Sequence, residues 1–470
     1  MTTLYVELDR NSNIALHKQL ILKLKDQILC ASIAANAKLP SSRVLAKDLG
    51  VSRIVTIAAY EQLIAEGYLT SRAGSGTFTS ASIPEKPKTN NKDYVGPSWF
   101  NAETKKKTCI YDHEIKVKYD FSIGHPATKL LPRNSWNRAW RKALSRSFSG
   151  ERPDRAGIVS IREALTGHLE RSRNIFCHPD NIIITSGVAE TLRLLSKVMT
   201  KFEPEIFMES PGFNVAHHWL AGCGKVTAIN VDERGLIASE LPMSALGPTM
   251  LFCTPSHQFP LGFRLNLKRR GEILKWARNN DALILEDDYD SEFHYDSMPL
   301  PTLKSQDESG HVVYFSSFSK SVSPNIKVGY LIAPDNICAV LKNIIAQEHA
   351  EPPFLMQEAM AHFIESGDLD KHIARSRRHY AKLNKIMREK LSDLPTGVTV
   401  SGLESGIHAF ISFKEFPTAL IKKLKEKSFH LPHQISENDW KGFALGYGHF
   451  EEDQLSEALE LLKSVLNTEL

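Results

Sequence analysis

Hydrophobic and polar positions follow two different patterns along this chain, and the change falls near residue 120. Between residues 14 and 79, apolar residues recur at helical spacing, as at Ile57, Tyr60 and Ile64, and the segment ends in a glycine-rich turn. From Asp120 onward, short apolar runs alternate with helical stretches. Strands buried on both faces and separated by helices are typical of a mainly parallel sheet. The pattern therefore predicts a small helical domain followed by a large α/β domain.

The expected elements of the second domain can be placed from these runs. Strands are expected at Ile182–Thr185, Ile206–Glu209, Thr249–Cys253, Ala282–Glu286 and Val312–Ser316, and helices at Ile158–Arg171, Ala189–Thr200 and Leu267–Asn279. The segment before them is polar, rich in lysine and interrupted by prolines, which is typical of a linker. We therefore place a first domain at residues 1–80, a linker at 81–119 and a second domain at 120–470.

Charge is distributed unevenly along the 470 residues. The net charge is only +4, but residues 1–80 carry nine Lys and Arg against six Asp and Glu, and residues 81–119 carry eight against five. The remaining residues therefore sum to −2. The excess positive charge lies where the phosphate backbone of DNA could use it. With 42% hydrophobic and 24% charged residues, the composition is that of an ordinary globular protein.

Other site classes are disfavoured by the spacing of cysteines, histidines and apolar runs. The six cysteines are scattered without a CxxC pair, which favours a reducing cytosol over a disulfide framework or a zinc site. His217-His218, His257 and His294 fit no metal-ligand spacing, so no metal site is expected. Residues Met1–Arg10 show no basic region followed by an apolar stretch, so no secretory signal is expected, and no apolar run approaches the about 18 residues that span a bilayer. We expect a cytoplasmic protein with no membrane partner.

The stretch Leu39–Phe78 predicts two short helices followed by two strands. Gly50 permits a tight turn between the helices, Ser52 can cap the second helix, and Ala73–Gly76 can join the strands. A plain helical hairpin would give a similar pattern. The letters LPSSRVLAKDLGVSRIVTIAAYEQLIAEGYLTSRAGSGTF, however, resemble the GntR-type winged helix-turn-helix over some forty residues.

The resemblance implies a DNA-binding surface at the second helix and the wing. Arg53 lies at the start of that helix, where a side chain can enter the major groove and form two hydrogen bonds with guanine. The expected DNA contacts are Arg43, Ser52, Arg53, Arg72, Gly74, Ser75 and Gly76. Ile54-Val55-Thr56 departs from the polar residue and Thr-Val usual in the family, so no base contact is assigned to these positions.

Three segments of the second domain carry residues suited to an aldehyde cofactor. Lys320 follows the apolar run Val312–Tyr314 in a serine-rich loop and could form a Schiff base, although most such loops have no catalytic role. Asp287 and Tyr289 follow an apolar strand, where a carboxylate could pair with a pyridine nitrogen; a solvated acidic turn or a metal cluster is the alternative. Ser186–Thr191 opens a helix after a strand, which is typical of a phosphate-binding turn.

Together these segments resemble the MocR family of regulators, in which a GntR-type winged helix is fused to a fold-type I aminotransferase-like domain. The signature blocks are TPSHQFPLG at Thr254–Gly262, EDDYDSEFHYDSMPLPTL at Glu286–Leu303 and SSFSKSVSPNIKVGYL at Ser316–Leu331. SGERPDRAGIVSIREALTGHL at Ser149–Leu169 resembles a further block. The resemblance implies a large α/β domain that binds pyridoxal 5′-phosphate (PLP), with a smaller C-terminal α/β subdomain.

The roles implied by the resemblance fall on nine residues. Lys320 would hold the aldehyde carbon, Asp287 the pyridine nitrogen and Tyr289 the 3′-oxygen, and Phe213 would stack on the ring. The phosphate would be held by Gly187, Val188, Ser317, Ser319 and Lys327. Lys327 stands where the family often has arginine, which keeps the charge and loses the bidentate geometry.

Val215 and Ala444 occupy positions where an amino-acid-binding relative has arginines that hold a substrate carboxylate. We therefore expect a regulator rather than an efficient enzyme. It would be a domain-swapped homodimer that binds operator DNA and responds to PLP itself or to an amine or amino acid, with RNA polymerase as a further partner. The alternatives are an active aminotransferase with a DNA-binding appendage and a regulator whose second domain is a dimerisation scaffold without cofactor.

Overall fold

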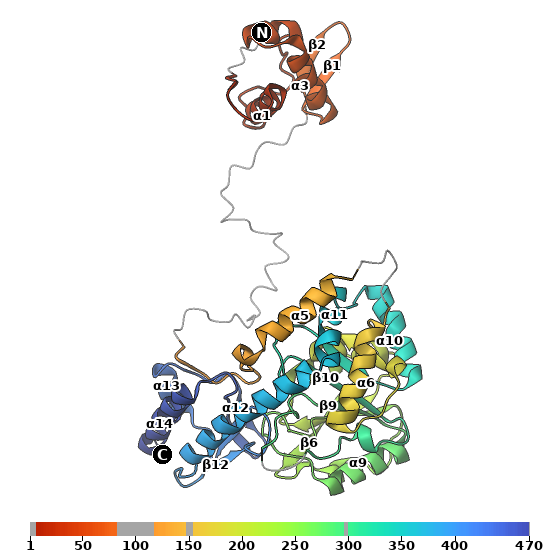
Figure 1. The fold of residues 1–470 in the computed structure, drawn as a ribbon, viewed down its shortest axis with the longest axis vertical. Helices are drawn as coiled ribbons and strands as arrows, with labels where there is room; N and C mark the ends of the chain where they lie inside the picture. Colours follow the sequence, from red (N-terminus) through yellow and green to blue (C-terminus); the bar gives the residue numbers. More distant parts are fainter. Residues whose placement is uncertain (1–5, 82–116, 147–153, 296–298, 470) are drawn as a thin grey trace. The chain divides into compact units, whose positions relative to one another are not determined.

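The computed structural model describes residues 6–81, 117–146, 154–295 and 299–469, and the chain divides into two compact units, Met1–Tyr111 and Asp112–Leu470 (Figure 1). Apart from its ends, the predicted linker at 81–119 lies outside the described residues. The domain boundaries proposed at residues 80 and 120 therefore stay predictions.

The first unit is a winged helix-turn-helix. Its elements are α1 (Leu16–Leu29), α2 (Ser42–Asp48), α3 (Arg53–Ala65), β1 (Leu69–Arg72) and β2 (Gly76–Thr79). The side chain of Ser41 accepts a hydrogen bond from the amide of Val44 and caps α2. β1 and β2 form an antiparallel hairpin whose turn contains Gly74, with φ of +72°. A positive φ favours glycine at this tip of the wing.

Helix α3 buries a face slightly different from the predicted one. Tyr60 is buried as expected, but the residues that share its face are Thr56, Ala59 and Leu63, while Ile57 is only partly buried. The Thr56 hydroxyl lies 2.9 Å from the backbone oxygens of Ser42 and Arg53 and can donate to either. Thr56 therefore ties α2 to α3, and its burial agrees with the absence of an assigned base contact.

The second unit is built on an eight-stranded sheet in the order β4-β11-β10-β9-β8-β5-β6-β7. Its strands are β4 (Ile182–Thr185), β5 (Glu205–Ser210), β6 (Lys225–Asp232), β7 (Gly235–Leu236), β8 (Thr249–Cys253), β9 (Leu283–Asp287), β10 (Val312–Ser317) and β11 (Gly329–Ile332). β11 is antiparallel to β4 and β10, β7 is antiparallel to β6, and the other neighbours are parallel. The predicted mainly parallel sheet is confirmed.

Helices cover both faces of this sheet, and each face forms its own hydrophobic core with them. The helices are α5 (Arg133–Leu144), α6 (Val159–Arg173), α7 (Val188–Met199), α8 (Asn214–Leu220), α9 (Leu267–Asn280), α10 (Asp335–Glu348), α11 (Phe354–Glu365) and α12 (Asp368–Lys390). Short 3-10 turns lie at Thr128–Leu130, Pro179–Asn181, Ala238–Glu240 and Lys304–Gln306. In β4, Ile182 and Ile184 pack into the core beside α6, whereas Ile183 packs into the core beside α7. This alternation explains why the strands are apolar throughout.

A smaller C-terminal subdomain completes the second unit. Its antiparallel sheet has the order β12-β13-β16-β15, and its core includes residues from α12, α13 and α14. The elements are β12 (Val398–Ser401), β13 (His408–Phe413), α13 (Thr418–Glu426), β14 (Phe429–His430), β15 (Gln434–Glu437), β16 (Trp440–Gly446) and α14 (Glu452–Glu469). β3 (Tyr119–Asp120) pairs in parallel with β14 and begins the described part of this unit. No helix within the described ranges is long and apolar enough to cross a membrane.

Candidate functional site

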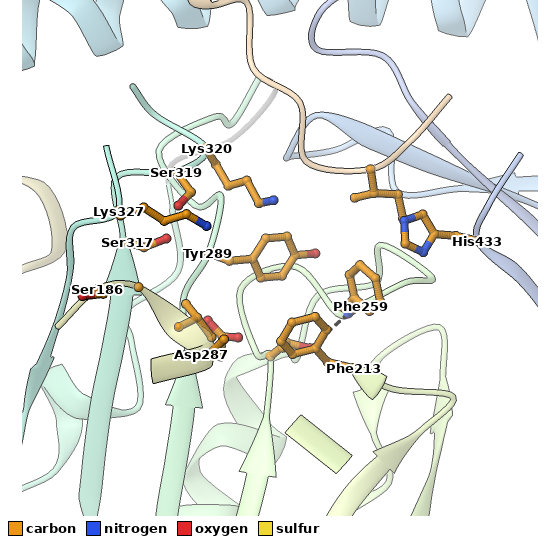
Figure 2. A pocket seen from close by; sticks show the side chains of 15 residues that line it. Ser186, Phe213, Phe259, Asp287, Tyr289, Ser317, Ser319, Lys320, Lys327 and His433 are labelled. Carbon is orange, nitrogen blue, oxygen red and sulfur yellow. Dashed lines mark hydrogen bonds between the residues drawn. The ribbon is translucent and has the colours of Figure 1, made fainter. Parts of the chain in front are cut away.

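A cavity of about 280 Å³ lies at the carboxyl ends of β9 and β10, and Figure 2 shows the side chains that surround it. In an open α/β sheet this edge is the usual place for a ligand. The lining residues are Ile123, Ser186, Gly187, Val188, Ala189, Phe213, Thr254, Phe259, Asp287, Tyr289, Ser317, Ser319, Lys320, Lys327 and His433. The structure thus brings all nine residues expected at the cofactor around one cavity.

Lys320 extends into this cavity from the loop after β10 (Figure 2). Its Nζ donates a hydrogen bond to the carbonyl oxygen of Gly124, 3.2 Å away. A Cβ atom on Gly124 would lie 1.9 Å from that Nζ, so a larger residue at position 124 would require the lysine side chain to move. Burial lowers the pKa of Lys320, against the attraction of Asp290 and Asp287. A lowered pKa increases the fraction of neutral amine, which is the nucleophilic form.

Asp287 and Asp288 have opposite environments although they are neighbours. Asp287 ends β9, is buried, and its Oδ1 has no hydrogen-bond partner within the described part of the chain. Burial and the charge of Asp288 raise its pKa well above the ordinary value. Asp288 is also buried, yet Arg173 and the hydroxyls of Ser291 and Tyr314 hold its pKa below the ordinary value. Asp287 is therefore the carboxyl group available to a ligand.

Tyr289 belongs to a buried polar group beside the lysine. Its hydroxyl lies 3.3 Å from Nδ1 of His257, and that nitrogen lies 2.9 Å from Oδ2 of Asp290. Burial and the charge of Asp290 raise the pKa of Tyr289 well above the ordinary value. The phenol therefore stays protonated at neutral pH and can donate a hydrogen bond. His257, which the sequence analysis did not regard as a metal ligand, pairs here with a carboxylate.

The opposite wall of the cavity is suited to an anion. Gly187 precedes the first residue of α7 with φ of +115°, a conformation that favours glycine, and Gly187, Val188 and Ala189 at this helix start line the cavity. Ser317 and Ser319 lie beside Lys327 on the same wall in Figure 2. Amides, hydroxyls and one ammonium group together match the donors that a phosphate requires.

An apolar wall faces these polar groups. Phe213 and Phe259 pack edge to face, with ring centroids 5.4 Å apart.

Val215, two residues beyond Phe213 on α8, is 38% exposed, and Ala444 is fully buried in β16 among Val231, Leu261 and Phe410. Of the described residues that line the cavity, only Lys320 and Lys327 carry a lysine or arginine side chain. The positions compared with substrate-binding arginines therefore contribute no cation.

Sequence reasoning missed six of the lining residues. Thr254 and Phe259 belong to the block Thr254–Gly262, so their motif was noticed without a role being assigned to them. Ser186 and Ala189 belong to the predicted phosphate-binding turn Ser186–Thr191, but no role was assigned to them. Ile123 and His433 come from segments that carried no motif, and only the tertiary fold brings them to the cavity.

The first unit presents a second candidate surface. Arg43, Ser52 and Arg53 are exposed near the start of α2 or α3, and Ser52 precedes α3 without a side-chain capping hydrogen bond. Gly74, Ser75 and Gly76 are exposed at the wing. Arg72 is engaged within the unit, since its Nη2 donates to Asn36 at 3.1 Å and its guanidinium lies 4.5 Å from the ring centroid of Phe78.

Comparisons with known proteins agree with this division. Residues 16–79 match the family described as bacterial regulatory proteins, gntR family, and residues 116–434 match aminotransferase class I and II. Over 97% of its length the chain is 29% identical to the probable rhizopine catabolism regulatory protein MocR of Rhizobium meliloti, of which the alignment covers 95%. It is 30% identical to the pyridoxine biosynthesis transcriptional regulator PdxR of Corynebacterium glutamicum, with 97% of both chains covered.

Solved structures show the same fold for the second unit. An archaeal alanine:glyoxylate aminotransferase superposes with a TM-score of 0.70 at 19% identity, over 80% of this chain and 97% of the other. A kynurenine aminotransferase of Pyrococcus horikoshii gives 0.67 at 19% identity, over 80% of this chain and 96% of the other. With the winged helix, the cavity and the full-length similarity to HTH-type regulators, the chain belongs to the MocR family of GntR-type transcriptional regulators.

Proposed function

We propose that this regulator binds PLP in the cavity at Lys320 and operator DNA through residues 14–79. The observation that carries the proposal is Oδ1 of Asp287, which has no hydrogen-bond partner among the described residues and is buried in the wall of a cavity that Lys320 also lines. A buried carboxyl oxygen without a partner is costly unless a ligand satisfies it. A protonated pyridine nitrogen is such a ligand, so the residues present fit the cofactor.

Each wall of the cavity would serve one part of the cofactor. Asp287 would hold the ring nitrogen, Tyr289 would donate to the 3′-oxygen, Phe213 would contact the ring face, and Lys320 would supply the attaching amine. The phosphate would be held by Ser317, Ser319, Lys327 and the amides of Gly187 and Val188. When bound, PLP supplies an aldehyde carbon that reacts with primary amines.

The cavity favours sensing over turnover. Holding an amino-acid carboxylate for efficient catalysis would need a cation besides those used for PLP, and Val215 and Ala444 supply none. PLP itself is therefore the first candidate effector, and an amine or amino acid is the second. One similar regulator is named for pyridoxine biosynthesis, which supports PLP as the effector. The other is named for rhizopine catabolism, which supports an amine or amino acid.

In the DNA-bound state, Arg53 would contact a base in the major groove, and Arg43 and the wing would contact phosphates. The family suggests a domain-swapped homodimer, acting in the cytoplasm with RNA polymerase as a further partner. Effector binding would then bias dimer geometry and so the spacing of DNA half-sites.

The test is a spectral titration of the full chain with PLP, followed by borohydride reduction and peptide mapping. We expect a visible absorption band and a reduced adduct at residue 320, both lost in Lys320→Ala. The matched variant Lys327→Ala should keep the band with weaker PLP affinity. DNA binding is then measured with and without PLP. A wild-type protein that stays colourless would leave only the scaffold alternative, and keto-acid exchange at about one turnover per second or faster would favour the aminotransferase.

A further inference from the structure

Asp120, His125 and His449 converge on one point at the edge of the second unit. Their ligand atoms, one from each side chain, all lie within 4.8 Å of one another. Asp120 ends β3, His125 lies in the segment that follows it, and His449 lies beyond the end of β16. Two segments more than 300 residues apart in the sequence therefore bring two imidazoles and one carboxylate together.

These three side chains are held unequally. Oδ1 of Asp120 accepts hydrogen bonds from the amide of Ser122 at 2.9 Å and from its hydroxyl at 2.6 Å, which orients the carboxylate. The His449 ring is partly buried, and its Nδ1 is a buried atom without a hydrogen-bond partner among the described residues. His125 is exposed, and its ring centroid lies 5.4 Å from that of His449. A buried imidazole nitrogen without a partner calls for a ligand.

We propose that Asp120, His125 and His449 bind one divalent first-row transition metal ion, Zn²⁺ in the first instance, and leave a coordination position open to solvent. Two imidazoles and one carboxylate are a ligand set that such ions accept. Zinc–ligand bonds of about 2.0–2.2 Å place tetrahedral ligand atoms about 3.3–3.6 Å apart. Asp120 is oriented by Ser122, and His449 is packed. His125 is exposed, so its side chain can rotate and bring its ring nitrogen closer to the ligand atoms of Asp120 and His449.

A second triad, formed by His257, Asp290 and His408, is a weaker candidate. All three side chains are fully buried, and Asp290 already lies within hydrogen-bond distance of His257 beside Tyr289. That triad packs against Tyr289, which lines the cofactor cavity. The Asp120 triad instead has an exposed ligand through which an ion can arrive.

The proposed metal site adjoins the segment that contacts Lys320. His125 directly follows Gly124, whose carbonyl accepts the hydrogen bond from Lys320, and Ile123 lines the cavity. A bound ion would hold residues 120–125 in place next to the lysine. The open position would accept an oxygen or nitrogen donor from a small ligand that approaches the cavity.

The experiment uses the full chain without an affinity tag, because added histidines would bind the probe. Co²⁺ is titrated first, since a tetrahedral cobalt site gives an intense visible absorption, and Zn²⁺ is then used to displace it. We expect one equivalent to bind with Kd on the order of 1 μM or tighter. His125→Ala, which changes an exposed residue, should weaken binding at least tenfold. His178→Ala is the matched control, because His178 is an exposed histidine beside Asp180 without a second histidine in the group.

Saturable one-to-one binding that is lost in His125→Ala and kept in His178→Ala would support the site. The absence of a one-to-one cobalt spectrum would overturn it, and so would unchanged affinity in His125→Ala, which would assign the metal elsewhere. The outcome is independent of the proposed function, because the PLP band at Lys320 is measured separately on protein without added metal.

Discussion

Arg173 and Asp288 form an ion pair inside the second unit, with Nη2 of Arg173 2.8 Å from Oδ2 of Asp288 and both side chains buried. The pair joins the last residue of α6 to the residue that follows β9. Because Asp288 is paired with Arg173, Asp287 is left as the carboxyl group that faces the cavity. The different environments of Asp287 and Asp288 therefore depend on Arg173, which lies 115 positions from Asp288 in the sequence.

Replacing Arg173 should destabilise the second unit strongly. Arg173→Leu leaves the charge of Asp288 buried without its partner, which costs about 3–5 kcal/mol. Guanidinium denaturation followed by circular dichroism measures the effect. Arg171→Leu is the control, because Arg171 is 57% exposed and its pair with Asp370 should contribute at most about 1 kcal/mol. Equal losses in the two variants would contradict the role of the buried pair.

Asp287→Asn should stabilise the cofactor-free protein at neutral pH and weaken PLP binding. When folding raises the pKa of a carboxyl group, the folded state loses stability as the pH rises from the unfolded pKa of that group, about 3.9, towards its folded pKa. Asparagine removes this cost, yet it cannot pair as an anion with a protonated ring. We expect a higher melting temperature without PLP and at least tenfold weaker PLP affinity.

The control for this variant is Asp307→Asn. Asp307 accepts a hydrogen bond from the amide of Val312, and its pKa is lowered because this bond and Lys304 outweigh burial. Its carboxylate therefore contributes stability above the unfolded pKa, so Asp307→Asn should lower the melting temperature and leave PLP affinity unchanged. A change of the same sign in both aspartate variants would argue against the assignment of Asp287.

The rate at which PLP attaches to Lys320 should rise with pH, and this rise should occur at lower pH than for an ordinary lysine. Burial lowers the pKa of Lys320 from 10.5, so the neutral amine accumulates at a lower pH. Stopped-flow absorbance at a series of pH values should show a rate that rises with pH and levels off before pH 10.5. A midpoint at or above 10.5 would mean that the amine is not desolvated in the reacting state.

Arg53 and Arg72 should differ in their effect on DNA binding. The exposed Arg53 side chain makes no hydrogen bond or ion pair with another described residue, whereas Arg72 is engaged by Asn36 and Phe78. Arg53→Ala should cost about 1–3 kcal/mol of affinity and relax base preference, while Arg72→Ala should have a smaller, sequence-independent effect. Fluorescence anisotropy with an operator selected from random DNA measures both. PLP uptake should be unchanged in either variant, and its loss in Arg53→Ala would contradict separate modules.

The large sheet was predictable because its strands are apolar throughout. β4 and β8 have the predicted bounds, since each is buried along its whole length and followed by a polar or small residue. The nine residues that the family resemblance implied for the cofactor all line one cavity, since most of them follow strands whose carboxyl ends meet at one edge. The inward face of α3 was less certain, because its small and polar residues Thr56 and Ala59 carry part of the packing.

Residues that tertiary structure alone brings together could not be predicted. His433 reaches the cavity from the C-terminal subdomain, and no local motif marks it. His125 and His449 meet across the fold, so ligand spacing along the sequence could not reveal them, and no metal site was expected there. The separate environments of Asp287 and Asp288 were also hidden, because they depend on the distant Arg173.

The parallel pairing of β3 with β14 places the start of the second unit close to its reactive amine. Asp120 is hydrogen-bonded into this small sheet, and Gly124 follows four positions later with its carbonyl on Nζ of Lys320. Four extended residues span at most about 14 Å. A displacement of residues 120–124 would thus move the carbonyl oxygen that holds the lysine amine, and a ligand that fills the cavity would act on the same short segment through Ile123.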